Sequence, residues 1–236
     1  MRVSFKRWFW RWFWRAFLLS ICALFAYQFW IFAQVVYWNY YNPSSSAFMR
    51  SQLEALRQQK AEAKLRTHWV PYERISPHLK RAIIAAEDAK FLAHEGFDFE
   101  ALQNAYQKNL KKGRLVAGGS TISQQLAKNL FLSSEKTPWR KIQEAVITVM
   151  LEKVMSKQRI LEIYLNVIEW GNHVFGAEAA ARHYYGVSAA SVSAEQAARL
   201  AAMIPNPRFY DKRRNTSLLT KKTRVILRRM ASASIP

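Results

Sequence analysis

The chain has 236 residues, of which 50% are hydrophobic, and its 36 basic residues against 16 acidic ones give a net charge of +20. This length allows one domain with a buried core, and only seven glycines and seven prolines argue against an all-β fold and favour helices. The single cysteine, Cys22, excludes an intramolecular disulfide and a cysteine-based metal site.

An uncharged segment runs from Phe17 to Trp38. As a helix it is long enough to cross a hydrocarbon core of roughly 30 Å. The flank before it has five basic residues and no acidic one, so the positive-inside rule predicts a cytoplasmic N-terminus. A cleaved signal peptide is the alternative, but the apolar run is long and no A-x-A-like site follows promptly. We therefore expect residues 1–16 to be a cytoplasmic basic and aromatic flank and residues 17–38 a transmembrane helix.

The excess of basic residues continues after this segment, because only five of the 36 basic residues precede position 50. Nucleic acid is a frequent partner of such charge, but a domain beyond the membrane meets lipid headgroups and phosphorylated lipid-linked substrates instead. Part of the charge can also be a solvated surface that keeps the domain soluble. We predict no nucleic-acid partner.

Residues 39–68 are predicted to form a juxtamembrane linker, and residues 69–236 a compact domain. Within that domain, residues 98–117 are predicted to form a mobile flap, because the lysines around Gly113 offer little to bury. Helix starts are predicted where a capping residue is followed by proline, or by glutamine three residues later, at Ser76, Thr121, Thr137 and Ser193.

Leu79, Ile83 and Glu87 repeat every four residues and so share one face of the first predicted helix. A carboxylate that ends an apolar stripe is desolvated, which raises its pKa and makes it a better proton acceptor near neutral pH. A solvated glutamate at a helix end is the alternative reading of its position.

Two later segments offer groups that can bind anions. Thr121, Gln125 and Lys128 project from one side of a helix, and its N-terminal amides together with the lysine can hold phosphate oxygens; an ordinary solvated helix face is the alternative. Arg140 and Glu144 can pair across one helical turn, which contributes about 0.2–0.5 kcal/mol when exposed.

Four ordered segments together resemble the glycosyltransferase domain that polymerises peptidoglycan from lipid II. They are EDAKFLAHEGFD (Glu87–Asp98), GGSTISQQLAKNLFL (Gly118–Leu132), RKIQEA (Arg140–Ala145) and KQRILEIYLNVIEWG (Lys157–Gly171). With one membrane segment before them, the chain resembles the monofunctional biosynthetic peptidoglycan transglycosylases. The resemblance implies a mainly α fold: an N-terminal transmembrane helix, then a lysozyme-like helical domain with a small membrane-proximal lobe.

The same resemblance implies the roles of individual residues. Glu87 would be the catalytic base and Glu144 the other essential carboxylate. Residues implied to bind or shape the substrate site are Asp88, Phe91, His94, Ser120, Thr121, Gln125, Lys128, Asn129, Lys136, Arg140 and Lys141. In the fourth segment Glu162, Tyr164 and Asn166 match the family, but their apolar helical surroundings favour a packing role.

The implied reaction links disaccharide units through β-1,4 bonds with inversion and releases undecaprenyl diphosphate. Diphosphate leaves as a stabilised anion, so the site needs cations more than a proton donor; Lys128, Arg140 and Lys136 suit that task. We expect no metal site and no tightly bound cofactor, although Glu87 and Asp88 could attract a stimulating divalent cation. The implied partners are lipid II, the growing lipid-linked glycan, membrane lipids, and separate transpeptidases and division proteins.

The implied location is the cell inner membrane, with a single pass and a periplasmic catalytic domain. A membrane-anchored, lysozyme-like enzyme that cleaves peptidoglycan is the main alternative, and a non-catalytic basic anchor protein is another. The S-x-x-K match at Ser133–Lys136 would suggest a transpeptidase, but no S-D-N or K-T-G companion appears. We therefore expect no transpeptidase domain.

Overall fold

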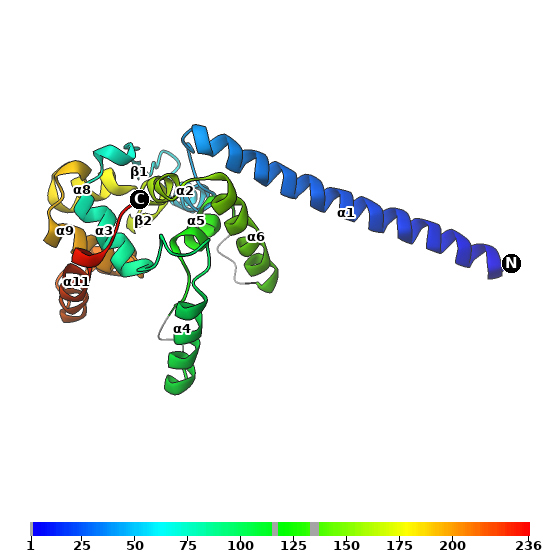
Figure 1. The fold of residues 1–236 in the computed structure, drawn as a ribbon. Helices are drawn as coiled ribbons and strands as arrows, with labels where there is room; N and C mark the ends of the chain where they lie inside the picture. The colour runs from blue at the N-terminus through cyan, green and yellow to red at the C-terminus, as the bar shows by residue number, and fades with distance from the viewer. Residues whose placement is uncertain (1, 115–117, 133–136) are drawn as a thin grey trace. The chain divides into compact units, whose positions relative to one another are not determined.

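The computed structural model of the protein describes residues 2–114, 118–132 and 137–236, with side chains described from residue 8 onward. The chain divides into two compact units, Met1–Tyr41 and Asn42–Pro236. Helices dominate both units (Figure 1), with eleven α-helices in the described ranges. The predicted mainly α fold is confirmed.

The first unit contains one long helix, α1 (Arg2–Tyr40). Its stretch Trp8–Tyr40 is long and apolar enough to cross a membrane. The predicted span, residues 17–38, lies inside this helix. The observed helix continues through the basic and aromatic flank as well, since arginine side chains are good helix formers and this flank has no proline or glycine to stop it.

The second unit holds all the remaining elements. Its helices are α2 (Ala47–Gln59), α3 (Pro77–Glu87), α4 (Phe99–Lys112), α5 (Ile122–Phe131), α6 (Pro138–Val154), α7 (Lys157–Val167), α8 (Ala177–Tyr185), α9 (Ala194–Met203), α10 (Pro207–Lys212) and α11 (Ser217–Arg229), with short 3-10 turns η1 (Tyr72–Arg74), η2 (Ala189–Ser191) and η3 (Met230–Ser232). The strands are β1 (Arg66–Thr67), β2 (Glu169–Gly171) and β3 (Val174–Phe175).

The helix starts predicted from capping residues are all observed. Ser76, Thr121, Thr137 and Ser193 each accept a hydrogen bond from a backbone N–H of the first turn that follows. At Thr121 and Ser193 a glutamine three residues later returns the contact and completes a capping box. These signals are local, so the fold does not override them.

The second unit includes the predicted linker from Asn42 onward as well as the predicted domain. One reason is that β1 pairs in parallel with β3, with Arg66 opposite Val174 and Thr67 opposite Phe175. The strand order is β1-β3-β2. Part of the predicted linker is therefore built into the fold through a pairing distant in sequence.

Residues 99–112, within the predicted flap, form the helix α4. Asp98 caps its start by accepting a hydrogen bond from the N–H of Ala101, and Gly113 ends it in the left-handed conformation at φ 61°. Figure 1 shows α4 projecting from the rest of the second unit. The capping residues favour a helix here, although the segment offers little hydrophobic surface to bury.

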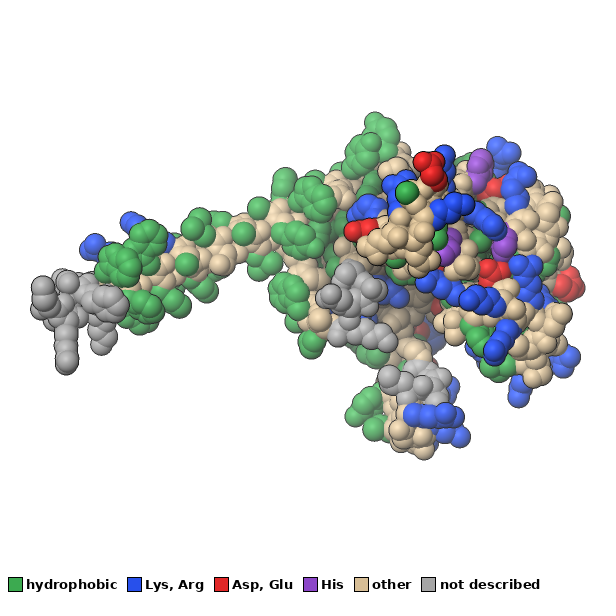
Figure 2. Space-filling view, turned by 180° about the vertical axis from the view of Figure 1, so that it is seen from behind, with side chains coloured by type: hydrophobic (Ala, Val, Ile, Leu, Met, Phe, Trp, Pro, Cys, Tyr) green, Lys and Arg blue, Asp and Glu red, His purple; other side chains and the backbone are tan. Residues whose placement is uncertain are grey.

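The core of the second unit forms around two groups of helices. In one, α9 packs against α3 and α11; in the other, α5 packs against α2, α6 and α7. The largest fully buried side chains are Trp170, Tyr164, Phe91 and Phe175. The surface seen in Figure 2 carries many Lys and Arg side chains and few acidic ones. The C-terminal end of α3, in the first group, contacts α5, in the second group, through Glu87 and Gln125.

Candidate active site

Glu87 is the last residue of α3. Ile83 and Leu79, one and two turns earlier on the same face, are fully buried. Burial raises the pKa of Glu87, as the apolar stripe predicts, although a hydrogen bond from Gln125 and the charges of Lys222 and Lys128 oppose the increase. The carboxyl group is therefore biased toward holding a proton more readily than a solvated glutamate does.

Gln125 connects α5 to this carboxylate. Its side-chain Nε2 donates to Glu87 Oε2 at 2.8 Å, while its Oε1 accepts from the Tyr164 hydroxyl at 2.9 Å. The other carboxylate oxygen, Glu87 Oε1, has no hydrogen-bond partner among the described residues. One oxygen is thus fixed by the protein and the other remains accessible to a ligand.

One cavity of about 290 Å³ unites the predicted catalytic groups. Glu87 and Glu144 both line it, although they lie 57 positions apart in the sequence. The remaining lining residues are Ser120, Gln124, Gln125, Lys128, Ile204 and Pro205. The structure therefore brings together the two carboxylates and the α5 lysine, which the sequence could only place on separate helices.

Glu144 is nearly fully buried, with 3% of its surface exposed. It accepts a hydrogen bond from Arg140 Nη1 at 3.3 Å and another from the Lys141 ammonium. The i, i+4 pair with Arg140 confirms the contact that the helical spacing predicted. Because two cations hold Glu144, its environment differs from that of Glu87.

A second cavity, of about 310 Å³, adjoins the first and shares Gln125, Lys128 and Ile204 with it. Arg140 and Asn129 also line it, among mainly apolar walls that include Phe48, Leu132, Ile168 and Pro207. The side-chain ammonium of Lys128 has no hydrogen bond or ion pair within the described residues, and Arg140 Nε is buried without a partner there. Two cations beside apolar walls suit an anion that carries an apolar chain.

Lys128 is exposed to solvent over part of its length, yet desolvation of its ammonium lowers its pKa. The charge of Glu144 opposes this change, whereas Arg140 and Lys141 add to it. An unpaired, partly desolvated ammonium between other cations is electrostatically costly, and a bound anion would relieve that cost.

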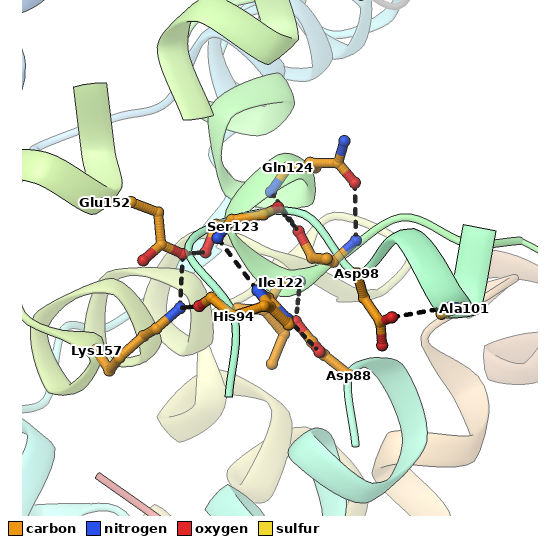
Figure 3. A network of polar contacts seen from close by, with 11 residues as sticks. Asp88, His94, Asp98, Ala101, Ile122, Ser123, Gln124, Glu152 and Lys157 are labelled. Carbon is orange, nitrogen blue, oxygen red and sulfur yellow. Dashed lines mark hydrogen bonds and ion pairs between the residues drawn. The ribbon is translucent and has the colours of Figure 1, made fainter. Parts of the chain in front are cut away.

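Four of the predicted site residues, Asp88, Phe91, His94 and Thr121, do not line the cavity shared by Glu87 and Glu144, although Asp88 and Thr121 line a third cavity beside Glu87. Asp88 uses both carboxylate oxygens within the protein: Oδ1 contacts His94 Nε2 at 2.9 Å, and Oδ2 accepts from the N–H of Ile122 at 3.0 Å (Figure 3). His94 Nδ1 accepts from the N–H of Gly96, so Nε2 carries the proton that is donated to Asp88. The carboxylate thereby fixes the start of α5 next to the end of α3.

Phe91, which was predicted to bind or shape the site, has no exposed surface, so in this structure it can shape the site only through packing. Lys157 lies over its ring at 4.7 Å and donates to Glu152 and to the carbonyl of His94 (Figure 3). Thr121 is also buried; its hydroxyl donates to the carbonyl of Gly96 at 2.7 Å. This network holds the segment after α3 against α5, α6 and α7.

A third cavity, of about 250 Å³, opens on another side of Glu87. Ser120 lines both this cavity and the first one, and Arg229 contributes from α11. Lys222, also on α11, is close enough for its charge to lower the pKa of Glu87. Both cations were missed in the sequence, although their i, i+7 spacing places them on one helix face.

One described cation of the predicted set, Lys141, does not line these cavities. Lys141 pairs with Glu144 from an exposed position. Lys136, together with the S-x-x-K match Ser133–Lys136, lies outside the described residues. In the described ranges, no cluster of three or more His, Cys, Asp or Glu side chains could hold a metal ion.

Comparisons with known proteins agree with this geometry. The family model described as "Transglycosylase" matches residues 53–231. A biosynthetic peptidoglycan transglycosylase of Nitrosospira multiformis is 78% identical over 98% of this chain and 99% of its own length. Proteins of the same name from Methylobacillus flagellatus and Herminiimonas arsenicoxydans are 65% and 56% identical, covering 98% and 100% of this chain and 99% and 100% of their own lengths.

Proposed function

This chain belongs to the transglycosylase family, and from that premise we propose that it polymerises the glycan chains of peptidoglycan from lipid II. It joins disaccharide units through β-1,4 bonds with inversion and releases undecaprenyl diphosphate. The name shared by its relatives, biosynthetic peptidoglycan transglycosylase, supports the class of reaction. The observation that carries the proposal is the cavity lined by Glu87, Glu144 and Lys128 together.

Glu87 acts as the general base in this proposal. Its free oxygen, Oε1, takes the proton from the 4-hydroxyl group of the acceptor sugar as that oxygen attacks the anomeric carbon of the donor. Burial raises the pKa of Glu87, which makes it a stronger proton acceptor than a solvated carboxylate while it remains available in its ionised form. Gln125 holds the second oxygen and so fixes the direction of the carboxylate.

Lys128 and Arg140 receive the leaving diphosphate. Lys128 lines both the catalytic cavity and the neighbouring apolar one, and Arg140 lines the latter. Their charges stabilise the departing anion, so no protein acid has to protonate it. Glu144 orients Arg140 and Lys141 through its ion pairs. Lys136 is proposed to assist at the same anion.

The anchor and the partners belong to the same proposal. Helix α1 is compatible with a single-pass membrane anchor, and the basic flank before its apolar part supports an N-terminus in the cytoplasm and a periplasmic catalytic domain at the inner membrane. Growing lipid-linked glycan and membrane lipids would be its ligands, and separate transpeptidases and division proteins its partners. We propose that no tightly bound cofactor takes part and that a divalent cation only stimulates the reaction.

The test uses the purified full chain with labelled lipid II, comparing wild type with Glu87→Gln. We expect polymeric glycan from the wild type and a rate lower by roughly 10²–10⁴ in the variant, the usual contribution of a positioned general base. Glu95→Gln is the matched control, because Glu95 is an exposed glutamate paired with Lys153 and lines none of the three cavities. An unimpaired Glu87→Gln variant would contradict the base assignment.

The same preparation, incubated with isolated peptidoglycan, separates synthesis from cleavage. A polymerase releases no soluble fragments from it, whereas a lysozyme-like hydrolase does. Glycosidases protonate a poor alkoxide leaving group and use a paired acid for that purpose. Here the second carboxylate, Glu144, is instead engaged by two cations, which favours synthesis. Release of muropeptides without polymer formation would overturn the proposal.

A further inference from the structure

Tyr164 lies on α7, and its hydroxyl group contacts Gln125, the residue that holds Glu87. Its side chain is fully buried, and the sequence predicted only a packing role. In the structure its hydroxyl lies 2.9 Å from Gln125 Oε1, and Gln125 Nε2 lies 2.8 Å from Glu87 Oε2. A continuous line of hydrogen bonds thus joins α7, α5 and the end of α3.

The chemistry of the three groups fixes the direction of these bonds. An ionised carboxylate can only accept, so Gln125 must present its NH₂ group to Glu87. Its carbonyl oxygen then faces Tyr164, and the phenol must donate. A flipped amide would set its oxygen against a carboxylate oxygen. The carboxylate therefore selects the amide orientation, and the phenol hydroxyl adds a second hydrogen bond that holds the amide in it.

The phenol of Tyr164 keeps its proton at neutral pH. Burial raises its pKa well above the ordinary value, and the charges of Glu87 and Asp88 raise it further. It is consequently a permanent donor rather than a group that exchanges protons with the substrate. This separates its role from that of Glu87.

We propose that Tyr164 is a positioning residue for Glu87 that acts through the side-chain amide of Gln125. The assignment rests on the proposed function and extends it, because it names a residue that orients the carboxylate of the proposed base. A phenol that only filled space would be replaceable by phenylalanine, which has the same ring, without effect on the reaction.

Tyr164→Phe tests this role, because it removes one hydroxyl group and keeps the packing. We expect kcat for glycan polymerisation to fall roughly tenfold, the usual size of one lost hydrogen bond in a buried site, with KM changed less than about twofold because no substrate contact is removed. The matched control is Tyr72→Phe. Tyr72 is also buried, with 6% of its surface exposed, and its hydroxyl donates to the main-chain oxygen of Pro236, away from Glu87. That variant should keep the wild-type kcat.

The acidic limb of the pH profile gives a second readout. The hydrogen bond from Gln125 lowers the pKa of Glu87, so a loosened Gln125 raises it. The limb should then move to higher pH, since the base works only when ionised. The other charges that act on Glu87 are Lys222 from α11, Lys128 from α5 and Asp88 beside it, with Glu144 across the cavity; Tyr164→Phe leaves all four in place.

A double-mutant cycle and a direct titration complete the test. In a Gln125→Ala background, Tyr164→Phe should cost less than about twofold, because the link is already broken. Infrared titration can follow the Glu87 carboxyl directly, because its band is the one missing in Glu87→Gln. In Tyr164→Phe this titration should show the higher pKa of Glu87 in the absence of substrate. An unchanged titration in folded Tyr164→Phe would overturn the positioning role even if the protein proved not to polymerise lipid II. A full tenfold loss in the Gln125→Ala background would also overturn it.

Discussion

Glu87 and Glu144 line one cavity, but the protein surrounds them in opposite ways. Glu87 is contacted by a neutral amide from Gln125 and has no ion pair among the described residues. Glu144 contacts two cations, Arg140 and Lys141. Two carboxylates of one cavity can therefore perform different tasks, because their neighbours differ.

This difference in neighbours suggests separate roles for the two carboxylates. Glu144 has ion pairs with two cations, so this residue is suited to hold them in place. Glu87 has no ion pair among the described residues, and burial raises its pKa. The carboxylate with fewer charged partners, Glu87, is therefore the one proposed as the base.

Removing the charge of Lys128 should have the largest effect among the residues around these carboxylates. Lys128→Met keeps the length of the side chain but leaves the departing diphosphate without the unpaired cation of the cavity. We expect kcat for lipid II polymerisation to fall by roughly 10²–10³, as when one preorganised oxyanion donor is lost. Lys153→Met is the control, since Lys153 is an exposed lysine paired with Glu95. Equal rates in the two variants would contradict an anion role for Lys128.

Glu144→Gln tests the other half of the comparison. The neutral amide cannot hold Arg140 and Lys141 as an ion-pair partner, so the cations lose their fixed positions. We expect kcat to fall by about ten- to a hundredfold, as expected for misplaced binding groups, with the acidic limb of the pH profile kept. If that limb vanished instead, Glu144 rather than Glu87 would be the titrating base.

The sequence predicted those parts of the site that depend on local structure. Ser76 caps α3 and Thr121 caps α5, so the positions of Glu87 and Gln125 on their helices follow from spacing alone. The direction of the change in the pKa of Glu87 follows from the apolar stripe beneath it. Helix caps and helix faces are decided within a few residues, which is why they are readable.

Contacts between distant segments were not readable in the same way. Tyr164 meets Gln125 across 39 positions and Asp88 meets Ile122 across 34, and no local pattern encodes either meeting. Lys222 approaches Glu87 only because α11 packs on α3. The buried position of Phe91 has the same origin, since it is the packing of α7 behind it that closes off the ring. Tertiary packing selects such contacts, and it needs the whole fold.

Lys222 acts on the pKa of Glu87 through its charge and not through a hydrogen bond. Lys222 lowers the pKa of Glu87. Lys222→Met should therefore raise that pKa and move the acidic limb of log kcat/KM to higher pH, by less than about one unit. Lys221→Met is the matched control, because Lys221 is the exposed neighbour on the same helix. A shift toward lower pH would contradict the geometry.

Asp88 offers the finest test, because it follows Glu87 directly and yet has a supporting position. Asp88→Asn keeps one acceptor oxygen, but its NH₂ group must then face either the N–H of Ile122 or the protonated Nε2 of His94. We expect the free energy of unfolding to fall by about 1–3 kcal/mol, the cost of one buried donor without a partner, measured by urea denaturation.

The same variant should change the reaction only slightly, and in the opposite direction to Lys222→Met. The charge of Asp88 raises the pKa of Glu87, so its removal lowers that pKa and moves the acidic limb to lower pH by a few tenths of a unit. Asp98→Asn is the control for the stability measurement, since Asp98 caps α4 at a site that Glu87 does not contact. A large loss of kcat at unchanged stability would place Asp88 among the groups that touch substrate.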